Sequence, residues 1–396
     1  MTIRWVPFLV VVALNLLLDV YTWRVLRASR AKAVCHVVLS VLLFAAVLTV
    51  WLTPIGECGD GRFRLTMWLL YGYFAAYVPR YLALPFWLFG RQRRSLSSGK
   101  GRFIRRCATT IGILTFAIML WSALVTPRTL TVTEETVEYA DLPDAFDGYR
   151  IVQFSDTHLG SYCNGDTAFV ARYVQEINDL RPDMICFTGD LVNRFTREAM
   201  PFAPILRRLR AKDGVMSIHG NHDYDDYTTL DTLHRVADHR ALTYMETALG
   251  WTVLENEHRV VVRGADSIVV IGLGNNGGPV HPDYSDYAKA YPDYKDGNFK
   301  ILLQHGSKFW RKMVTAGSDN VHLTLSGHTH AMQMMVSAFG YRWSPAALMY
   351  KEWGGLYRDA DRDRYLNVNI GLGQVGIPSR IGATPEITVI TLNKKR

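Results

Sequence analysis

The sequence is poor in cysteine, with five in 396 residues. Cys35 and Cys107 lie in or beside apolar runs, and Cys186 lies in an expected buried strand. Cys58 and Cys163 look accessible, and we interpret them as ordinary free thiols. These cysteines do not suggest a disulfide framework. The chain also lacks internal repeats and low-complexity runs.

Basic residues are not in excess in the larger, C-terminal part of the chain. Residues 1–106 carry 15 Lys and Arg against 3 Asp and Glu, a net charge of +12, whereas the whole chain carries +8. Residues 107–396 therefore carry −4. A nucleic-acid-binding domain needs a basic patch on its folded surface, so we expect no nucleic-acid partner.

Long apolar runs are present, and they are concentrated near the N-terminus. Four segments each approach the ~20 residues that cross a bilayer as a helix: Trp5 to Trp23, Val34 to Thr53, Leu65 to Phe89, and Cys107 to Val125. The third contains Pro79 and Arg80, so it is either one kinked helix or two shorter pieces. Residues 1–125 are predicted to form a transmembrane region of about four helices surrounded by membrane lipids.

The loops between these segments differ in charge and indicate an orientation. The first loop carries four basic residues between Arg24 and Lys32, the third carries seven between Arg91 and Arg106, and the middle loop is balanced. Basic loops stay in the cytoplasm. Four spans then place the globular domain on the non-cytoplasmic face, periplasmic or extracellular. The conclusion reverses if the third segment does not span.

The remainder of the chain is expected to be a linker and one domain. Residues 126–148 are predicted as a short linker with a strand at 129–139, which holds the domain close to the membrane surface and favours a membrane-adjacent substrate. From residue 149 to residue 396 strand patterns alternate with helical ones, as in an α/β domain. Helices are expected at about 167–180, 197–211 and 229–249.

Polar side chains that suit metal ions follow five of the predicted strands. They are Asp156 and His158, Asp190, Asn221 with His222, His305, and His328 with His330. Ligands in α/β folds gather outside the carboxyl ends of strands, so we expect these groups to share one crevice. Oxygen and imidazole donors without thiolate suit a hydrolytic pair of divalent ions such as Mn, Fe or Zn. Such a pair needs a bridging carboxylate, and Asp190 can provide one.

Glycines precede three of the ligands at sharp turns from strand to loop. Gly189, Gly220 and Gly327 occupy positions where a side chain would obstruct the turn or an incoming phosphate. The order D-x-H, G-D, G-N-H-D, H and G-H-T-H resembles the calcineurin-like metallophosphoesterases from Tyr149 to the C-terminus. The tail motifs G-L-G, P-S-R and P-E-I-T-V-I-T-L resemble the membrane-associated YkuE/YaeI-like branch.

The resemblance implies an αββα sandwich over residues 149–396 that holds two metal ions. The ligands that it implies are Asp156, His158, Asp190 and His330 for one ion, and Asp190, Asn221, His305 and His328 for the other. It also implies that His222 contacts the phosphate and protonates the leaving oxygen, with Asp223 orienting His222. The branch usually continues G-H-T-H-G-G-Q, whereas Ala331, Met332 and Gln333 follow here. These bulkier residues are expected to narrow the pocket floor and change substrate choice.

The expected function is a membrane-anchored phosphoesterase in which a metal-bridging hydroxide attacks phosphorus. The substrate would be a phosphodiester, pyrophosphate or phosphomonoester near the membrane, and lipid-linked phosphates are among the candidates. The alternative is a non-catalytic binding or scaffold module on the same fold. The aromatic-rich pieces 284–294 and 339–353 would be lids, membrane-facing flaps or plain surface loops. Ordinary core or surface roles are expected for His219, His234, His239, His258, His281 and His322.

Overall fold

The structure is a computed structural model that describes residues 5–92, 99–162, 167–277, 282–293, 296–315, 320–359 and 362–396. Cys163, His281, and Arg93 and Arg94 of the third basic loop lie outside these residues. The chain divides into two compact units, Met1–Trp121 with Gly376–Pro378, and Ser122–Val375 with Ser379–Arg396.

Long helices make up the first unit. Helix α1 spans Trp5–Leu26, α2 spans Arg30–Leu52, α3 spans Asp60–Gln92 and α4 spans Gly99–Leu124. Among the described residues, three helical stretches are long and apolar enough to cross a membrane: Leu9–Leu26, Arg30–Leu52 and Gly99–Arg128. The four-helix transmembrane prediction therefore holds for α1, α2 and α4, while α3 is less apolar.

Helix α3 is one continuous helix despite Pro79 and Pro85. Its Arg80 donates to Asp19 of α1 at 2.8 Å, and the Tyr77 hydroxyl donates to the same carboxylate at 2.6 Å. Charged groups within apolar helices are costly unless they pair, and here they pair. Cys58, which we expected to be accessible, is buried because it packs in an apolar cluster with Phe63 and Met67 of α3.

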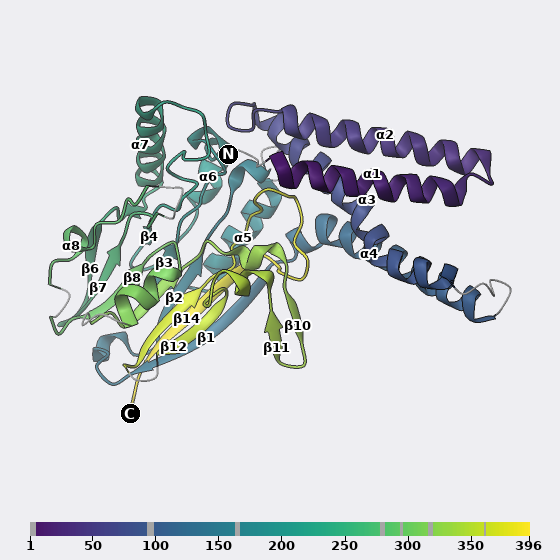
Figure 1. The fold of residues 1–396 in the computed structure, drawn as a ribbon. Coiled ribbons are helices and arrows are strands. Elements are labelled where there is room, and N and C mark those ends of the chain that lie inside the picture. The colour runs from purple at the N-terminus through teal and green to yellow at the C-terminus, as the bar shows by residue number, and fades with distance from the viewer. Residues whose placement is uncertain are drawn as a thin grey trace. The chain divides into compact units, whose positions relative to one another are not determined.

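The described part of the second unit contains two six-stranded sheets (Figure 1). The first has the order β1-β14-β2-β3-β4-β5 and the second β12-β13-β9-β8-β7-β6. The first-sheet strands are β1 (Thr131–Tyr139), β2 (Tyr149–Phe154), β3 (Met184–Phe187), β4 (Val215–Ser217), β5 (Thr252–Val253) and β14 (Glu386–Lys394). The second-sheet strands are β6 (Glu257–Arg263), β7 (Asp266–Gly272), β8 (Phe299–Leu303), β9 (Leu323–Ser326), β12 (Gly355–Asp359) and β13 (Arg364–Val368). Strand β1, within the segment predicted as a linker, pairs along its length with β14.

Helices cover the outer faces of the two sheets. They are α5 (Thr167–Asp179), α6 (Ala203–Leu206), α7 (Thr232–Ala248) and α8 (Tyr287–Ala290), with a π-helical turn at Trp310–Thr315. Short 3-10 turns lie at Thr126–Arg128, Asp144–Phe146, Leu159–Tyr162, Thr196–Glu198, Met200–Phe202, His330–Gln333 and Pro345–Leu348. Strands β10 (Val336–Ala338) and β11 (Tyr341–Trp343) form a separate hairpin.

Alternating side chains on each strand build the layers. Ile151 of β2 faces the core between the sheets, where it joins Ile301 of β8, whereas Val152 faces the layer that contains α5. A third apolar cluster covers the outer face of the second sheet. The predicted αββα sandwich is therefore confirmed. Strands β2, β3 and β4 run parallel, as do β7, β8 and β9, so the carboxyl ends of each set lie at one edge of its sheet.

The helix expected at 197–211 is broken into short pieces at Thr196–Glu198, Met200–Phe202 and Ala203–Leu206. Pro201 and Pro204 lie within it, and proline lacks the N–H that an interior helical position needs. The apolar periodicity of this segment still buries Phe202 and Leu206 against the first sheet.

Candidate metal centre

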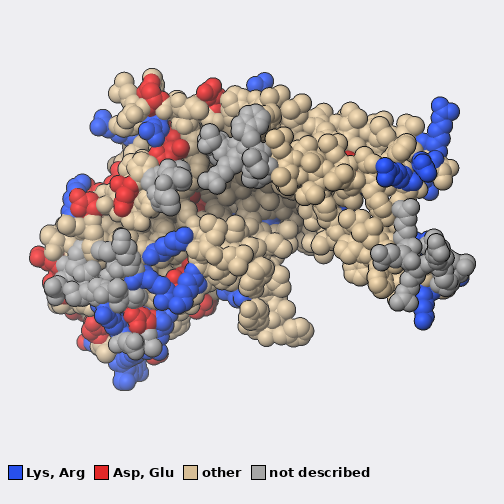
Figure 2. Space-filling model, in the orientation of Figure 1, with Lys and Arg blue, Asp and Glu red and all other residues tan. Residues whose placement is uncertain are grey.

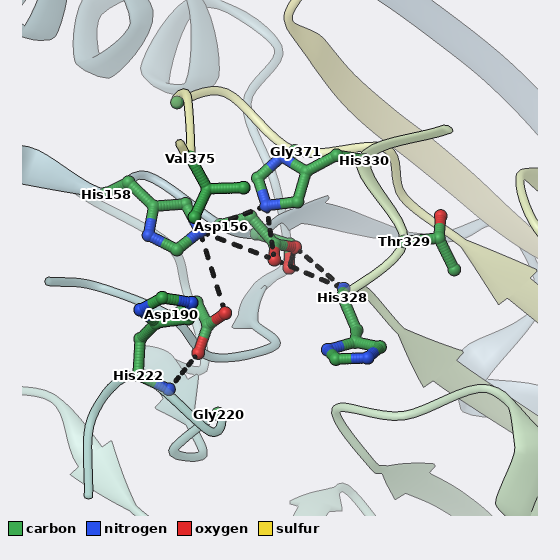
Figure 3. Close-up of polar contacts among 12 residues, drawn as sticks. Asp156, His158, Asp190, Gly220, His222, His328, Thr329, His330, Gly371 and Val375 are labelled. Carbon is green, nitrogen blue, oxygen red and sulfur yellow. Dashed lines mark hydrogen bonds and ion pairs between the residues drawn. The ribbon is translucent and has the colours of Figure 1, made fainter. Parts of the chain in front are cut away.

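The seven predicted ligands follow the strand ends and meet in one buried cluster. Figure 3 shows Asp156, His158, Asp190, His328 and His330 of this cluster. Asp156 and His158 follow β2, and Asp190 follows β3. Asn221 follows β4, His305 follows β8, and His328 and His330 follow β9. Side chains from both sheets therefore face one another across the strand edge.

Four side chains form the first group of donor atoms. His158 Nε2 lies 3.0 Å from His330 Nε2, and His330 Nε2 lies 3.2 Å from Asp156 Oδ1. Asp190 Oδ2 lies 3.6 Å from His158 Nε2. All four side chains are almost fully buried. Such donor spacings suit atoms that share one small cation.

The second group lies on the other side of Asp190. His305 Nε2 is 3.2 Å from Asp190 Oδ2, and Asp190, His305 and His328 have donor atoms within 4.8 Å of one another. Asn221 Oδ1 is 2.8 Å from His328 Nδ1. Asp190 thus belongs to both groups, which is the position of a bridging carboxylate.

When their rings are neutral, two ligating histidines turn the lone pair of Nε2 toward the cluster, because Nδ1 is held by a backbone carbonyl. His158 Nδ1 donates to the Val192 carbonyl at 3.2 Å, and His305 Nδ1 donates to the Thr188 carbonyl at 2.7 Å. In a neutral ring the other nitrogen, Nε2, is then an acceptor. His305 Nε2 has no hydrogen-bond partner among the described residues although it is buried. Converging lone pairs beside carboxylates repel one another unless a cation lies between them, so the residues present fit divalent ions.

The electrostatics of the cluster also favour bound cations. Burial and the neighbouring His305 lower the pKa of His328 to about 4, and burial lowers the pKa of His158 well below its usual range. Both rings therefore stay neutral ligands. Burial also disfavours the charged form of His305, but the Asp190 carboxylate outweighs it and raises the pKa of His305 to about 10. The cluster thus favours positive charge beside Asp190.

Five of the seven ligands adopt left-handed backbone conformations. The φ angles are 51° at Asp156, 43° at His158, 62° at Asp190, 75° at His328 and 50° at His330. Non-glycine residues take this conformation only at a cost that the surrounding structure compensates, and such residues gather at functional sites.

The glycines beside the ligands are needed for space, as predicted. A Cβ at Gly220 would overlap the Asp190 carboxylate and the His305 ring. A Cβ at Gly327 would overlap the Asp156 carboxylate. At both positions a side chain would occupy the place of the donor atoms.

Asp223 holds two ligand-bearing loops together. Its Oδ2 accepts from the backbone N–H groups of Asp190 at 2.7 Å and Gly220 at 2.9 Å. Its Oδ1 accepts from the N–H groups of Leu191 at 2.8 Å and Val192 at 3.2 Å. The carboxylate therefore ties the loop after β3 to the loop after β4.

The orienting role that the resemblance implied for Asp223 is carried by another group. His222 Nδ1 donates to the carbonyl of Asn193 at 2.7 Å, so this carbonyl, rather than the Asp223 carboxylate, fixes the His222 ring. The ring of Tyr227 stacks on His222 with centroids 4.1 Å apart, and the Tyr227 hydroxyl accepts from Asn221 at 2.8 Å. Sequence reasoning missed Asn193 and Tyr227, and the only available signal was their closeness to the motifs.

Two further neighbours of the ligands come from the C-terminal part of the chain. The fully buried Arg380 places Nη2 3.2 Å from His330 Nδ1, and its remaining contacts include the carbonyls of Ile370 and Gly373. The Tyr350 hydroxyl lies 2.9 Å from His328 Nε2. Arg380 belongs to the P-S-R motif of the C-terminal tail, and the sequence alone did not indicate its contact with a ligand.

Ala331 and Met332 stand where the branch has two glycines, and Gln333 keeps the glutamine of that motif. Ala331, Met332 and Gln333 take φ angles of 50°, 47° and 54°, a conformation that glycine adopts more readily. Gln333 donates to and accepts from the backbone of Val375, and Met332 is half exposed. The long side chain of Met332 therefore reaches solvent.

A second histidine cluster adjoins the centre. One oxygen of Glu255 accepts from His219 at 3.0 Å, from His239 at 2.7 Å and from the Tyr224 hydroxyl at 3.2 Å. Donor atoms of these two histidines and Glu255 are close enough to hold an ion. Glu255 links the two histidines, and His239 Nδ1 donates to the Asp223 carbonyl at 2.8 Å. The buried His219 Nε2 has no hydrogen-bond partner among the described residues and lies 3.4 Å from Glu246 Oε1. The cluster thus supports the G-N-H-D loop through histidines for which we expected ordinary core or surface roles.

An αββα sandwich whose facing strand ends carry a buried Asp, Asn and His cluster defines a metallophosphoesterase domain. The model of the family described as "Calcineurin-like phosphoesterase" matches residues 149–332. The uncharacterized metallophosphoesterase YkuE of Bacillus subtilis is 34% identical over 275 residues, which cover 67% of this chain and 86% of that protein. The chain therefore belongs to the calcineurin-like metallophosphoesterases, and within them to the membrane-associated branch that includes YkuE.

Another relative is named as a transmembrane protein. The "Transmembrane protein with metallophosphoesterase domain" of Danio rerio is 28% identical over 288 residues, which cover 71% of this chain and 62% of that protein. Among solved structures, NAD nucleotidase (NadN) of Haemophilus influenzae matches with a TM-score of 0.37 and 14% identity over 57% of this chain and 45% of that chain. The family and the apolar helices together make this chain a membrane-associated protein of a phosphoester-hydrolysing family.

Proposed function

We propose that this protein is a membrane-anchored phosphoesterase that holds two divalent ions and hydrolyses a phosphodiester, pyrophosphate or phosphomonoester at the membrane face. The observation that carries the proposal is the position of Asp190, whose carboxylate lies within reach of both donor groups. The first ion would take Asp156, His158, Asp190 and His330. The second would take Asp190, Asn221, His305 and His328. The donor chemistry suits Mn, Fe or Zn.

Bound divalent ions would supply an activated water near neutral pH and charge stabilisation for the phosphate oxygens. The chain's own contribution centres on His222. Because Nδ1 of His222 donates to the Asn193 carbonyl, Nε2 is the atom that gains or loses a proton. Tyr227 stacked on the ring restricts its tilt. His222 is thereby positioned to donate a proton from Nε2 to the leaving oxygen.

The anchoring also supports a substrate at the membrane. Only residues 125–130 separate the end of α4 from the start of β1, so the globular unit cannot move far from the bilayer. The pairing of Arg80 with Asp19 lowers the cost of placing α3 in lipid, which favours four spans. Four spans together with the basic loops would put the catalytic unit on the non-cytoplasmic face. The net charge of −4 after residue 106 disfavours a nucleic-acid substrate.

The test uses full-length protein purified in detergent and supplied with Mn²⁺, with bis-p-nitrophenyl phosphate as the substrate. We expect hydrolysis that Asp190→Ala and His222→Ala abolish, while His234→Ala, which changes an exposed histidine, retains it. Activity that survives Asp190→Ala would refute the site. A purified protein that binds almost no metal would favour the scaffold alternative.

A further inference from the structure

One stretch of the globular unit combines apolar and basic residues without acidic ones. Residues 331–351, which follow the last metal ligand, contain four methionines, four aromatic residues, Arg342 and Lys351, and no Asp or Glu. We call this stretch the apolar hairpin segment. The rest of the unit carries a surplus of acidic residues, so the composition is local.

The apolar side chains of this segment face outward. Strands β10 and β11 pair only with each other and project from the globular unit (Figure 1). The turn residue Phe339 is fully exposed, and Tyr341 is 70% exposed. Leu348, beside the hairpin, is 81% exposed. In Figure 2 the projection appears as a tan surface, whereas most blue and red groups of the globular unit gather on its left side. Contiguous exposed apolar surface of this kind marks a binding site.

The base of the segment is firmly held, so the outward position of its tip is built into the fold. The Ser344 hydroxyl donates to the Ala331 carbonyl at 2.6 Å, and the Met335 N–H donates to the Ile381 carbonyl at 2.8 Å. Ala331, Ala346 and Trp353 form a small buried cluster beneath the hairpin. The apolar tip is therefore presented on a packed base.

The segment is also joined directly to the metal centre. It begins immediately after His330, and Tyr350 near its end contacts His328 Nε2 at 2.9 Å. Lys308 lies over the Tyr350 ring at 4.3 Å, which adds a basic group at the same margin. The segment that carries the hairpin therefore has both of its ends at the ligand cluster.

The chemistry of the segment fits a lipid bilayer. Aromatic residues are enriched at the level of the headgroups, and basic residues beside apolar ones attract anionic lipids. The globular unit is tethered to spanning helices by residues 125–130, so a bilayer is always within its reach. A soluble partner would have to compete with the bilayer for the exposed side chains of the segment.

We propose that the apolar hairpin segment inserts Phe339, Tyr341 and the neighbouring apolar residues into the bilayer interface. Insertion holds the metal centre at the level of the lipid headgroups. The consequence for the substrate, a phosphoester in the headgroup of a membrane amphiphile, rests on the proposed function. The insertion itself rests only on the hairpin and the tether, so the two fail separately.

Photolabelling of the full-length protein tests the insertion. The protein is placed in vesicles of phosphatidylethanolamine and phosphatidylglycerol (3:1) that contain a phospholipid with a diazirine in its acyl chain. After irradiation, lipid adducts are mapped by mass spectrometry. We expect adducts within residues 332–349 as well as in α1, α2 and α4. We expect none in α7, where Leu233 and Tyr244 are each 77% exposed and serve as matched controls.

Matched variants make the result specific. In Phe339→Ser/Tyr341→Ser the adducts at 332–349 should fall at least fivefold, whereas Leu233→Ser/Tyr244→Ser should leave them unchanged. Both variants should hydrolyse soluble bis-p-nitrophenyl phosphate as the unmodified protein does, which shows that they fold. Labelled helices with an unlabelled hairpin would overturn the proposal. So would cross-links from residues 336–343 to a second copy of the chain without lipid adducts. Failure of phosphoester hydrolysis alone would leave the adduct pattern, and hence the insertion, intact.

Discussion

The metal centre has two margins that differ in how they are held. The polar margin, formed by the loops after β3 and β4, is buried and bound by backbone hydrogen bonds to Asp223. The apolar margin, formed by the hairpin segment after β9, exposes Phe339 and Tyr341 to solvent. The polar margin satisfies its own groups and so fixes the chemistry. The apolar margin exposes apolar side chains, and we propose above that the bilayer interface covers them.

The largest expected effect comes from removing the carboxylate that holds the polar margin. Asp223→Ala leaves four buried N–H groups without their acceptor, and each such loss costs about 1–3 kcal/mol. We expect a loss of at least about 4 kcal/mol of stability, together with loss of activity. Thermal unfolding of the full-length protein in detergent measures the first. A variant that keeps the melting temperature of the unmodified protein would show that the two margins are held alike.

The next largest effect is expected from metal removal, which should lower the stability of the metal centre. The ions would bind only the folded arrangement of the seven ligands, so saturating metal at about 100 times Kd would add about 2.7 kcal/mol. We expect EDTA to lower the melting temperature of the unmodified protein and to leave that of Asp190→Ala unchanged. Readdition of Mn²⁺ should restore the difference. An equal response of both proteins to EDTA would contradict ion binding at Asp190.

The metal centre as a whole shows how far prediction from sequence reached. The seven candidate ligands could be named because each follows an apolar strand, and parallel strands bring their carboxyl ends to one edge. The Asn193 carbonyl that holds His222 could not be named, because a backbone contact leaves no mark in the residue type. Glu255 was missed because it meets His219 and His239 only after β5 has joined the sheet beside β4.

For the fold, too, some features could be predicted from the sequence and others could not. Apolar periodicity predicted the alternating strands and helices, since burial of one face is read directly from the residue types. It did not predict the breaks at Pro201 and Pro204, where the backbone overrides a buried face. Nor did it predict that β1 pairs with β14, because a contact between the two ends of a domain depends on the topology of the whole sheet.

A smaller effect is expected from a buried acid in the loop after β4. Burial and the neighbouring Asp238 raise the pKa of Asp225 to about 8, above the value of about 3.9 in an unfolded chain. Protonated Asp225 therefore stabilises the fold below about pH 4, and that contribution is lost as the pH rises to about 8. Asn at this position cannot ionise, can still donate to Asp238, and tolerates the left-handed φ of 56°.

Asp225→Asn should thus be more stable than the unmodified protein at pH 8.5, by about 1 kcal/mol after allowance for screening. The gain should shrink steadily as the pH falls to 5. Melting temperatures at a series of pH values, with exposed Asp179→Asn as the control, measure it. A gain that grows toward low pH would have the wrong sign for a raised pKa.

The smallest expected effect on stability belongs to the apolar margin and completes the comparison. Phe339→Ser/Tyr341→Ser removes side chains that contact mostly solvent, and surface substitutions usually change stability by less than about 0.5 kcal/mol. We expect the melting temperature in detergent and the hydrolysis of a soluble phosphodiester to stay unchanged. The same pair within the core would cost several kcal/mol. If the double variant unfolded as Asp223→Ala does, the hairpin would be part of the packed domain, and its exposed aromatic residues would need no bilayer to explain them.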